Sequence, residues 1–478
     1  MSLEYLKGNK NYFYIQKKIK MRLKKIILLL TPLLVVAFSK FRTLEISISD
    51  TNVYFYTAYQ ILQGKELYKD ILFTNLPLFP LVSVFYFLIT NGNIYLYYFT
   101  AAIESFMLAL LIYYVVYTET RHFLPSLLAS FIFSISIYNL STSSFQLGIF
   151  TASLFAVGSY ISIKKNNPFL TGILLSLCFL TKAYFIPVLI ALGLLALTTF
   201  IKKNLYKLIV GLFVGLIPLV PYLITSSSEM LRYLFDFSAQ KESTINKFSE
   251  LKAFLTYDFI YALLLPFMLI YKKHNRLFWA VLFVSFLIFF LYFDDFYYYY
   301  FGMIVPFLSI RAGHLVSYVF SKAKKVNVKT LLLIFFPPLI LFNLLRYSEI
   351  ATATRVYQID KIVTTINMIN PDYVYGKEIS PAAAYLSGKP LIEGIIDTNP
   401  LLFYYGFIDK NRVTEDVVNN KTVVITNGYE GRGQEVVNLP DIVNVDIFLK
   451  YCKKENSYPV IGRPLENRIF LYTCRGQN

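Results

Sequence analysis

The sequence predicts an α-helical protein that crosses a membrane many times and carries a C-terminal α/β domain outside the membrane. Three observations lead to this fold class. Of the 478 residues, 56% are hydrophobic and only 16% are charged, and repeated apolar runs are long enough to cross a bilayer. Short loops between these runs collect lysines and arginines. After Arg346 the long apolar runs stop, and short runs rich in β-forming residues begin.

Eleven apolar runs are expected to form transmembrane helices. The two shortest, Phe169–Lys182 and Asp258–Tyr271, fall below the roughly 17 residues that an untilted helix needs. The other nine are Lys25–Ser39, Asn93–Tyr117, Phe123–Leu140, Phe145–Ile163, Tyr184–Ile201, Leu205–Thr225, Phe278–Phe293, Tyr297–Phe320 and Thr330–Arg346. No small-residue cleavage site follows the first run, so we expect it to be retained as a helix.

The distribution of basic residues predicts the orientation, because short loops rich in lysine and arginine stay in the cytosol. Such residues lie in the N-terminal segment and in alternate loops: Lys17, Lys18, Lys20, Arg22, Lys24, Lys25, Lys164, Lys165, Lys202, Lys203, Lys272, Lys273, Arg276, Lys322, Lys324, Lys325 and Lys329. We therefore expect a multi-pass protein of the cell membrane with a cytosolic N-terminus and an extracytoplasmic C-terminal domain.

The net charge of +17 does not indicate a nucleic-acid partner. From residue 350 onward, 14 lysines and arginines balance 14 aspartates and glutamates, so the excess belongs mostly to the loops expected inside. Anionic head groups of membrane lipids are the polyanions that such loops meet.

Two domains are expected, a membrane domain over residues 1–349 and an extracytoplasmic α/β domain over residues 350–478. The second contains the β-rich runs "KIVTTINM", "PDYVYG", "KTVVITN" and "NRIFLYTC", separated by turn residues. Cys452 and Cys474 both lie in this domain and could pair, whereas Cys178 lies within an apolar run.

The first outer loop, residues 40–93, holds two aspartates, Asp50 and Asp70, in a chain that otherwise places few acids near its apolar runs. Thr51–Gln63 reads as a short helix with Ser49 or Asp50 as an N-cap and Gly64 as a stop. It is too short to span a bilayer, so we expect it to lie flat on the outer surface. Pro77 and Pro80 open a second short apolar piece that re-enters the interface.

These residues resemble a known family. An acidic residue after the first span, a short surface helix, the segment "GKELYKD" and a proline-containing apolar segment are similar to the first outer loop of the C-type superfamily of polyprenyl-phosphate-sugar-dependent membrane glycosyltransferases. The resemblance is to the family 39-like branch, with protein O-mannosyltransferases and lipid A aminoarabinose transferases. The tail segment "DYVYGKEISPAAAYLSGKPLIEGIIDTNPLLFYYG" resembles the outer domains of prokaryotic members.

The resemblance implies a glycosyltransferase that moves a sugar from a polyprenyl-phosphate donor to an acceptor hydroxyl on a protein, lipid or glycan. A mannose-like hexose is the first candidate sugar. Two other functions stay open from the residues alone. One is a transporter or flippase of lipid-linked saccharides, and the other is a non-catalytic structural relative.

By this resemblance Asp50 is the general base, since an acceptor hydroxyl has a pKa far above physiological pH and must lose its proton to attack. Thr51 stands where the protein mannosyltransferases have a glutamate. Capping the helix is the competing role for Asp50. Asp70, the second catalytic candidate, could position the acceptor, bind a cation or cap a turn.

Cationic residues are needed to hold the donor phosphate. Lys65, Lys69 and Arg232 are candidates in the outer loops, with Lys241 and Lys247 beside them, although solvated or snorkelling side chains are the competing explanation for each. Lys182 is a stronger candidate, because an ammonium near the bilayer is costly unless it meets an anion.

No metal site and no cofactor are predicted, and a divalent cation stays the open alternative. His122, His274 and His314 lie on or near the side expected inside, and Asp294 with Asp295 forms a lone acidic pair. The Trp-Trp-Asp-Tyr-Gly signature of the metal-using oligosaccharyltransferases is absent from the sequence.

Overall fold

The computed structural model describes residues 30, 45–202, 204–237, 246–270, 276–293, 296–322, 341–343, 345–346, 356, 358–431, 434–460 and 467–476. The predicted spans Lys25–Ser39 and Thr330–Arg346 lie almost wholly outside these residues, and so does the predicted domain boundary at 349/350.

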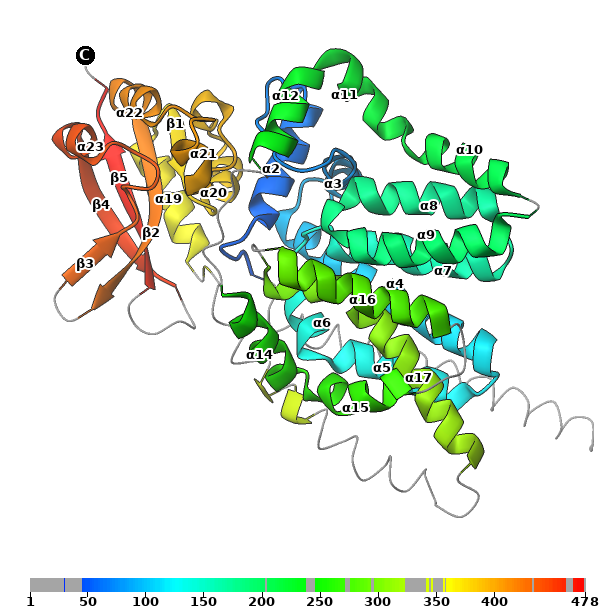
Figure 1. Ribbon diagram of the computed structural model, residues 1–478. Coiled ribbons are helices and arrows are strands. Elements are labelled where there is room, and N and C mark those ends of the chain that lie inside the picture. The colour runs from blue at the N-terminus through cyan, green and yellow to red at the C-terminus, as the bar shows by residue number, and fades with distance from the viewer. Residues whose placement is uncertain are drawn as a thin grey trace, which may run out of the picture.

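Helices form the membrane part, and Figure 1 shows them gathered on one side of the molecule with the sheet on the other. In chain order they are α2 (Thr51–Leu62), α3 (Leu78–Ile89), α4 (Ile94–Thr120), α5 (Phe123–Ile135), α6 (Ile137–Thr142), α7 (Ile149–Lys164), α8 (Pro168–Thr181), η1 (Ala183–Phe185), α9 (Ile186–Phe200), α10 (Leu205–Gly215), η2 (Ile217–Leu219), α11 (Val220–Thr225), α12 (Ser227–Leu231), η3 (Arg232–Asp236), α14 (Lys247–Tyr257), α15 (Phe259–Ile270), α16 (Arg276–Tyr292), η4 (Tyr298–Met303) and α17 (Val305–Lys322).

Within the described residues, three helical segments are long and apolar enough to cross a membrane: Ile94–Thr120, Ala183–Phe200 and Leu205–Thr225. The pair α14 and α15, bent by 92°, makes a fourth if it counts as one broken span. Shorter apolar helices, among them α5, α7, α8 and α16, cover further predicted spans. The architecture fits a membrane protein, and the number eleven stays a prediction.

One predicted span is interrupted, and a buried aspartate at the start of another predicted span lies at the break. Phe123–Leu140 forms α5 and α6, with a break at Ser136. The buried Asp258, between α14 and α15, accepts hydrogen bonds from the amides of Ile137 at 2.7 Å and Tyr138 at 2.8 Å. A helix start leaves amide donors without intrahelical partners, and this carboxylate satisfies them from a distant segment.

The C-terminal domain is a five-stranded sheet flanked by short helices. Its elements are α19 (Ile359–Ile369), β1 (Tyr373–Gly376), α20 (Ser380–Ser387), η5 (Ile392–Gly394), α21 (Pro400–Tyr404), α22 (Lys410–Asn419), β2 (Thr422–Gly431), β3 (Gln434–Val437), α23 (Val445–Tyr451), β4 (Cys452–Pro459) and β5 (Asn467–Cys474). The strand order is β1-β2-β5-β4 with β3 also paired to β2, and β1 runs parallel to β2 with Tyr373 opposite Thr422. The other pairings are antiparallel.

One predicted strand is wrong. The run "KIVTTINM" lies in the helix α19, because Ile359, Ile362 and Ile366 recur at helical spacing and are all buried on one face. Tertiary burial of this face outweighs the β-preference of its isoleucine, valine and threonine residues. Strands are found where the other three runs were expected, and β3 and β4 were not predicted.

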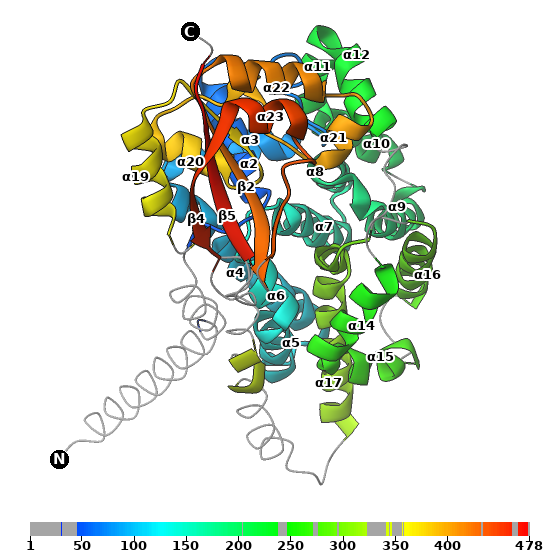
Figure 2. The ribbon, with the colours of Figure 1, turned by 90° about the vertical axis from the view of Figure 1, so that its left-hand side faces the viewer.

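The sheet has a core on each face. Figure 2 shows it between α19 and α20 on one side and α22 and α23 on the other. Val423, Ile425 and Leu471 pack with α19, α20 and the first outer loop, whereas Val424 and Tyr472 pack with α22 and α23. This alternation is the period of two expected for a strand buried on both faces.

The first outer loop shares the core of this domain. Phe55 of α2 lies 4.8 Å from the ring of Tyr385 in α20, and the amide of Leu391 donates to the hydroxyl of Tyr56 at 3.3 Å. The C-terminal domain therefore covers α2, and the expected orientation of α2 flat on the outer membrane surface stays a prediction. The first eight residues of α2 are buried beneath the C-terminal domain and against α3 and α4.

Candidate active site

Asp50, one of the two predicted N-cap residues, stands at the N-cap position of α2, but it does not cap the helix with its side chain. The first turn is closed by the backbone, where the amide of Tyr54 donates to the carbonyl of Asp50 at 3.0 Å. The residue is exposed, and its carboxylate is not used to hold the helix. The competing capping role is therefore not the one that the structure displays.

Asn52 fixes the start of α2 against three parts of the chain. Its Nδ2 donates to the carbonyls of Ser47 and Glu378, both at 2.9 Å, and its Oδ1 accepts from the hydroxyl of Tyr98 at 2.9 Å. Because Asn52 is fully buried and has charge-neutral partners on α4 and on the C-terminal domain, it holds the neighbouring Asp50 in one place.

Lys182 lies at the break between α8 and η1, where its extended backbone (φ −149°, ψ 106°) separates the two helices. Only 6% of the residue is exposed. Its Nζ donates to the hydroxyl of Tyr54 at 2.9 Å and lies 4.9 Å from the Tyr54 ring and 5.5 Å from the Phe79 ring. The aromatic faces and one phenol partly compensate the buried ammonium.

The Tyr54 phenol, bonded to Lys182, is also influenced electrostatically by two carboxylates. Burial raises the pKa of the Tyr54 phenol, and the negative charges of Asp50 and then Asp397 raise it further. The phenol therefore stays neutral and can donate or accept hydrogen bonds. Asp50 also acts electrostatically on the Lys182 ammonium. Asp397 belongs to the loop between η5 and α21, so the C-terminal domain contributes charge to this site.

A group of tyrosines continues the site beyond Lys182. Tyr184 stacks on Tyr300 with ring centroids 4.1 Å apart, and the Asp50 charge also reaches Tyr299. The hydroxyl of Tyr184 is buried, and none of the described residues forms a hydrogen bond with it. A buried polar group without a partner is costly, so this hydroxyl is suited to a ligand.

The other candidates in the first outer loop have local partners. The carboxylate of Asp70 accepts a hydrogen bond from the amide of Glu66 at 2.9 Å, which is the turn-capping role that the sequence left open. Lys69 is exposed and pairs with the Glu66 carboxylate at 3.4 Å. Lys65 is exposed beside Gly64. Roles for these three in binding or catalysis stay predictions.

In the second long outer loop, the guanidinium of Arg232 lies 5.2 Å from the ring of Phe407 in the C-terminal domain. Lys247 donates to the carbonyl of Leu291 at 2.6 Å. Lys241 lies outside the described residues. Of the basic candidates that the structure describes, Lys182 is the buried one.

Groups that could bind a metal are sparse in the part of the chain that the structure describes, where no three His, Cys, Asp or Glu residues gather. His122 is exposed at the start of α5, and His314 is buried with its Nε2 2.7 Å from a carboxylate oxygen of Glu119. His274 and the pair Asp294 and Asp295 lie outside the described residues.

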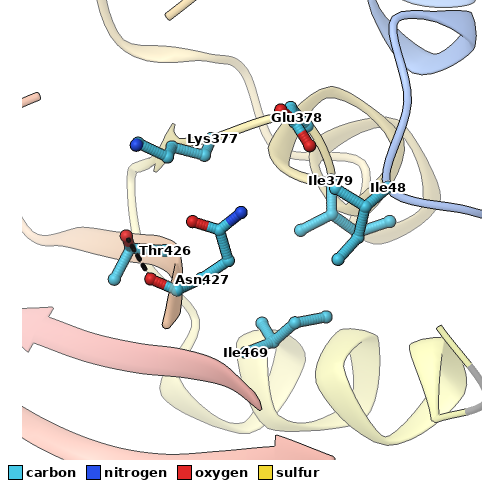
Figure 3. A pocket seen from close by; sticks show the side chains of 7 residues that line it. All are labelled: Ile48, Lys377, Glu378, Ile379, Thr426, Asn427 and Ile469. Atoms are coloured by element: carbon cyan, nitrogen blue, oxygen red, sulfur yellow. Dashed lines mark hydrogen bonds between the residues drawn. The ribbon is translucent and has the colours of Figure 1, made fainter. Parts of the chain in front are cut away.

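A small hollow lies where the first outer loop meets the sheet. Figure 3 shows Ile48 of the outer loop beside Ile379, with Ile469 of β5 on the opposite side. The hollow measures ≈ 10 Å³, which suits at most a single water molecule. It belongs to the packing between loop and domain and cannot hold a sugar.

Sequence reasoning missed three members of the site: Tyr54, Tyr184 and Asp397. Tyr54 follows Asp50 by four residues, so helical spacing places both on one face and could have indicated it. Tyr184 was close to the predicted Lys182 in a chain with 40 tyrosines, which made it inconspicuous. Asp397 had no local signal, because only the tertiary fold brings its loop to α2.

Comparisons with solved structures identify the fold. No model of a known protein family matches the chain, and no curated protein matches its sequence. ArnT from Cupriavidus metallidurans in the apo state is similar over 93% of this chain and 97% of its own, with TM-score 0.62 and 12% identity. The same protein bound to undecaprenyl phosphate gives the same coverage, with TM-score 0.59 and 13% identity.

The oligosaccharyltransferase from Archaeoglobus fulgidus in the apo form is also similar. It matches over 86% of this chain and 74% of its own, with TM-score 0.54 and 10% identity. Both neighbours are C-type glycosyltransferases, so the resemblance predicted from the first outer loop and the tail is confirmed for the fold. At these identities the similarity concerns the fold and leaves the reaction to the site itself.

Proposed function

We propose that this chain is an integral membrane glycosyltransferase that transfers a sugar from a polyprenyl-phosphate donor to an acceptor hydroxyl. A mannose-like hexose is the first sugar to test, and the acceptor is a protein, a lipid or a glycan. The fold of the two neighbours supports this class of reaction, and one of them was crystallised with undecaprenyl phosphate.

The observation that carries the proposal is the buried Lys182, whose ammonium is bonded to Tyr54 and is influenced electrostatically by Asp50. An ammonium that is only 6% exposed and bonded to a neutral phenol is stabilised by a bound anion. A lipid phosphate supplies that anion at the end of an apolar helix. Tyr54 and the buried hydroxyl of Tyr184 are further donors close to the same point.

In the proposed reaction, Asp50 takes the proton of the acceptor hydroxyl while the acceptor oxygen attacks the anomeric carbon. The bond between that carbon and the phosphate oxygen breaks, and its electron pair leaves with the polyprenyl phosphate. Lys182 stabilises the phosphate through charge-assisted hydrogen bonds. A single displacement inverts the anomeric centre. The leaving phosphate already carries charge, so the proposed step uses no cofactor or metal ion.

We place this reaction on the extracytoplasmic side of the cell membrane, with the N-terminus in the cytosol. Two features support that orientation. The C-terminal domain contains the disulfide Cys452–Cys474, which is typical of an oxidising compartment. Lys164 and Lys165 lie at the C-terminal end of α7, and basic residues at the end of a membrane helix are typical of a cytosolic face.

The test is sugar transfer by the purified full-length protein in detergent or nanodiscs. Labelled mannosyl polyprenyl phosphate is mixed with an extract of acceptors, and new glycosidic bonds are detected by mass spectrometry. Asp50→Asn should lower the transfer rate by about a hundredfold or more, because general-base catalysis contributes roughly that factor. Asp446→Asn, an exposed aspartate in α23, is the matched control and should not change the rate.

Other outcomes separate the rival functions. Full activity of the Asp50→Asn protein would rule out Asp50 as the base. Movement of label across a vesicle membrane without a new bond would identify a transporter or flippase. Binding of the donor without transfer or movement would indicate a non-catalytic relative. Loss of transfer on adding EDTA would show that a divalent cation is needed.

A further inference from the structure

A second candidate site lies at the far end of the helical bundle. A cavity of ≈ 330 Å³ opens between the ends of α4 and α7. Its lining residues are Tyr114, Val115, Thr118, Glu119, Tyr160, Ile161, Lys164 and Lys165. In the sequence these two lysines indicate only the orientation of the chain, and the proposed reaction does not involve the cavity.

The position of the cavity follows from the length of α4. This helix has 27 residues and is therefore about 40 Å long. It begins beside the C-terminal domain, where Gly92 approaches Tyr385, and the cavity lies at its last turns. Glu119, in the last turns, lies about 38 Å along the helix from Ile94, which exceeds the about 30 Å of a hydrocarbon core. The cavity therefore sits at the membrane surface opposite the candidate active site.

The charged side chains that line the cavity are held in place by contacts with Glu119. The Nζ of Lys164 lies 2.8 Å from Glu119, whose carboxylate also accepts from the hydroxyl of Tyr160 at 2.9 Å and contacts the buried His314 at 2.7 Å. One glutamate thus orients a lysine and a tyrosine. Lys165 adds a second positive charge, exposed at the mouth of the cavity. The two lysines outnumber the one carboxylate, so the lining attracts an anion.

Aromatic and aliphatic groups surround these charges. The Nζ of Lys164 lies 5.3 Å from the Tyr160 ring, and the Nζ of Lys165 lies 5.2 Å from the Tyr114 ring. Val115 and Ile161 form the apolar part of the lining. A ligand that meets lysines at the rim and hydrocarbon further in has a charged head and apolar chains.

We propose that this cavity binds the phosphate head group of one anionic phospholipid, with its acyl chains along α4 and α7. Basic pockets between membrane helices at the cytosolic surface are suited to such head groups. Inorganic phosphate shares the same charge chemistry but not the apolar chains. The inference is independent of the proposed glycosyltransferase activity, because it concerns the opposite membrane surface.

Native mass spectrometry of the full-length protein tests the proposal. After delipidation, the protein is incubated with phosphatidylglycerol or phosphatidylcholine in detergent, and retained lipid is counted. The wild type should retain one phosphatidylglycerol and little phosphatidylcholine. Replacing Lys164 and Lys165 by glutamine should weaken retention by about fivefold for each lysine, the effect of one basic residue at an anionic membrane surface.

The chain offers a matched control in Lys207, an exposed lysine 5.7 Å from the ring of its neighbour Tyr206 and outside the cavity. Lys207→Gln should retain the lipid as the wild type does. If the double variant fails to fold, Lys165→Gln alone serves, since Lys165 is exposed and lies outside the Glu119 ion pairs.

Three results would overturn the proposal. They are equal retention by the double variant and the Lys207→Gln control, equal retention of the two lipids by the wild type, and displacement of phosphatidylglycerol by millimolar inorganic phosphate. The last would mean that the cavity recognises free phosphate rather than a lipid.

Discussion

Lys182 carries an ammonium at a place where water is nearly excluded. Among the described residues its hydrogen-bond partner is the neutral phenol of Tyr54, and it forms no ion pair with a carboxylate there. Desolvating a charge without a counter-ion costs several kcal/mol unless another interaction offsets it. The arrangement is therefore expected to gain most from a bound anion, which links this residue to donor binding.

Replacing Lys182 by methionine should separate folding from binding. The variant removes a buried charge while keeping the volume of the side chain, so the thermal unfolding temperature should stay equal or rise. Affinity for polyprenyl phosphate should fall by on the order of tenfold or more, because a charge-assisted hydrogen bond is lost. Unfolding is followed by intrinsic fluorescence, and binding by titration with polyprenyl phosphate.

Lys361→Met, at an exposed position of α19, is the control and should leave both quantities unchanged. A Lys182→Met protein that unfolds several degrees lower but binds the phosphate normally would show that Lys182 only supports the structure.

At the same scale, the sequence predicted part of the site. Asp50 and Lys182 could be singled out because a charge near an apolar run is conspicuous and has few structural uses. Tyr184 and Asp397 could not, since one is hidden among many tyrosines and the other is recruited from the C-terminal domain. When the fold brings together residues that are far apart in the chain, a single sequence shows no local pattern that indicates it.

Two helix pairs of the membrane part are broken, α5 with α6 and α14 with α15. Asp258 receives the amides of Ile137 and Tyr138 and, at 3.1 Å, the hydroxyl of Tyr298. One buried carboxylate thus connects α6, the bend between α14 and α15, and η4. The predicted span that begins with Asp258 is therefore better described as one arm of a bent pair.

We expect Asp258→Asn to lower the free energy of unfolding by roughly 1–3 kcal/mol. The asparagine side chain keeps the shape of the aspartate but has an NH₂ group in place of one carboxylate oxygen. That NH₂ group then faces a backbone N–H, and neither donor has an acceptor. Asp258→Leu should be worse, because both backbone amides then lose their partner. Thermal unfolding of the purified protein in detergent measures this, with Asp360→Asn on the exposed side of α19 as control.

The Asp258→Leu protein could instead unfold at the same temperature as the wild type. That result would contradict the prediction, because water or lipid head groups would then satisfy the amides of Ile137 and Tyr138 equally well.

Helices were predicted correctly where the length of a segment and the spacing of its apolar residues both indicated a helix. The helix Thr51–Leu62 lies within one residue of its predicted end, because Asp50 and Gly64 bracket an apolar face. The prediction failed for α19, where β-branched residues outweighed a helical spacing of only three isoleucines. Nothing in the sequence indicated that the C-terminal domain would cover α2.

Across the whole molecule, the C-terminal domain is closed by a covalent bond at its edge. Cys452 and Cys474 are opposite each other in β4 and β5, and the structure pairs them as a disulfide across a sequence separation of 22. The sequence left this pairing open, because two cysteines in one domain do not fix their distance.

Removing the disulfide should destabilise the C-terminal domain by about 3 kcal/mol, the loop-closure value for a separation of this size. Cys452→Ser with Cys474→Ser is the variant, and Cys178, buried in α8, stays in both proteins. Unfolding with and without reductant should differ for the wild type and coincide for the double variant. Identical curves for the wild type in both conditions would mean that the disulfide does not form.

The shared core of the first outer loop and the C-terminal domain constrains how the protein is made. Asn52 bonds to a carbonyl 326 residues later in the chain, so the loop emerges from the ribosome long before its partner. At about 5–20 residues per second, synthesis leaves a gap on the order of tens of seconds. During that interval the buried face of α2 lacks its cover, and a chain that ends early never acquires it. Premature termination should therefore yield protein that a quality-control protease removes, even when every membrane helix has been inserted.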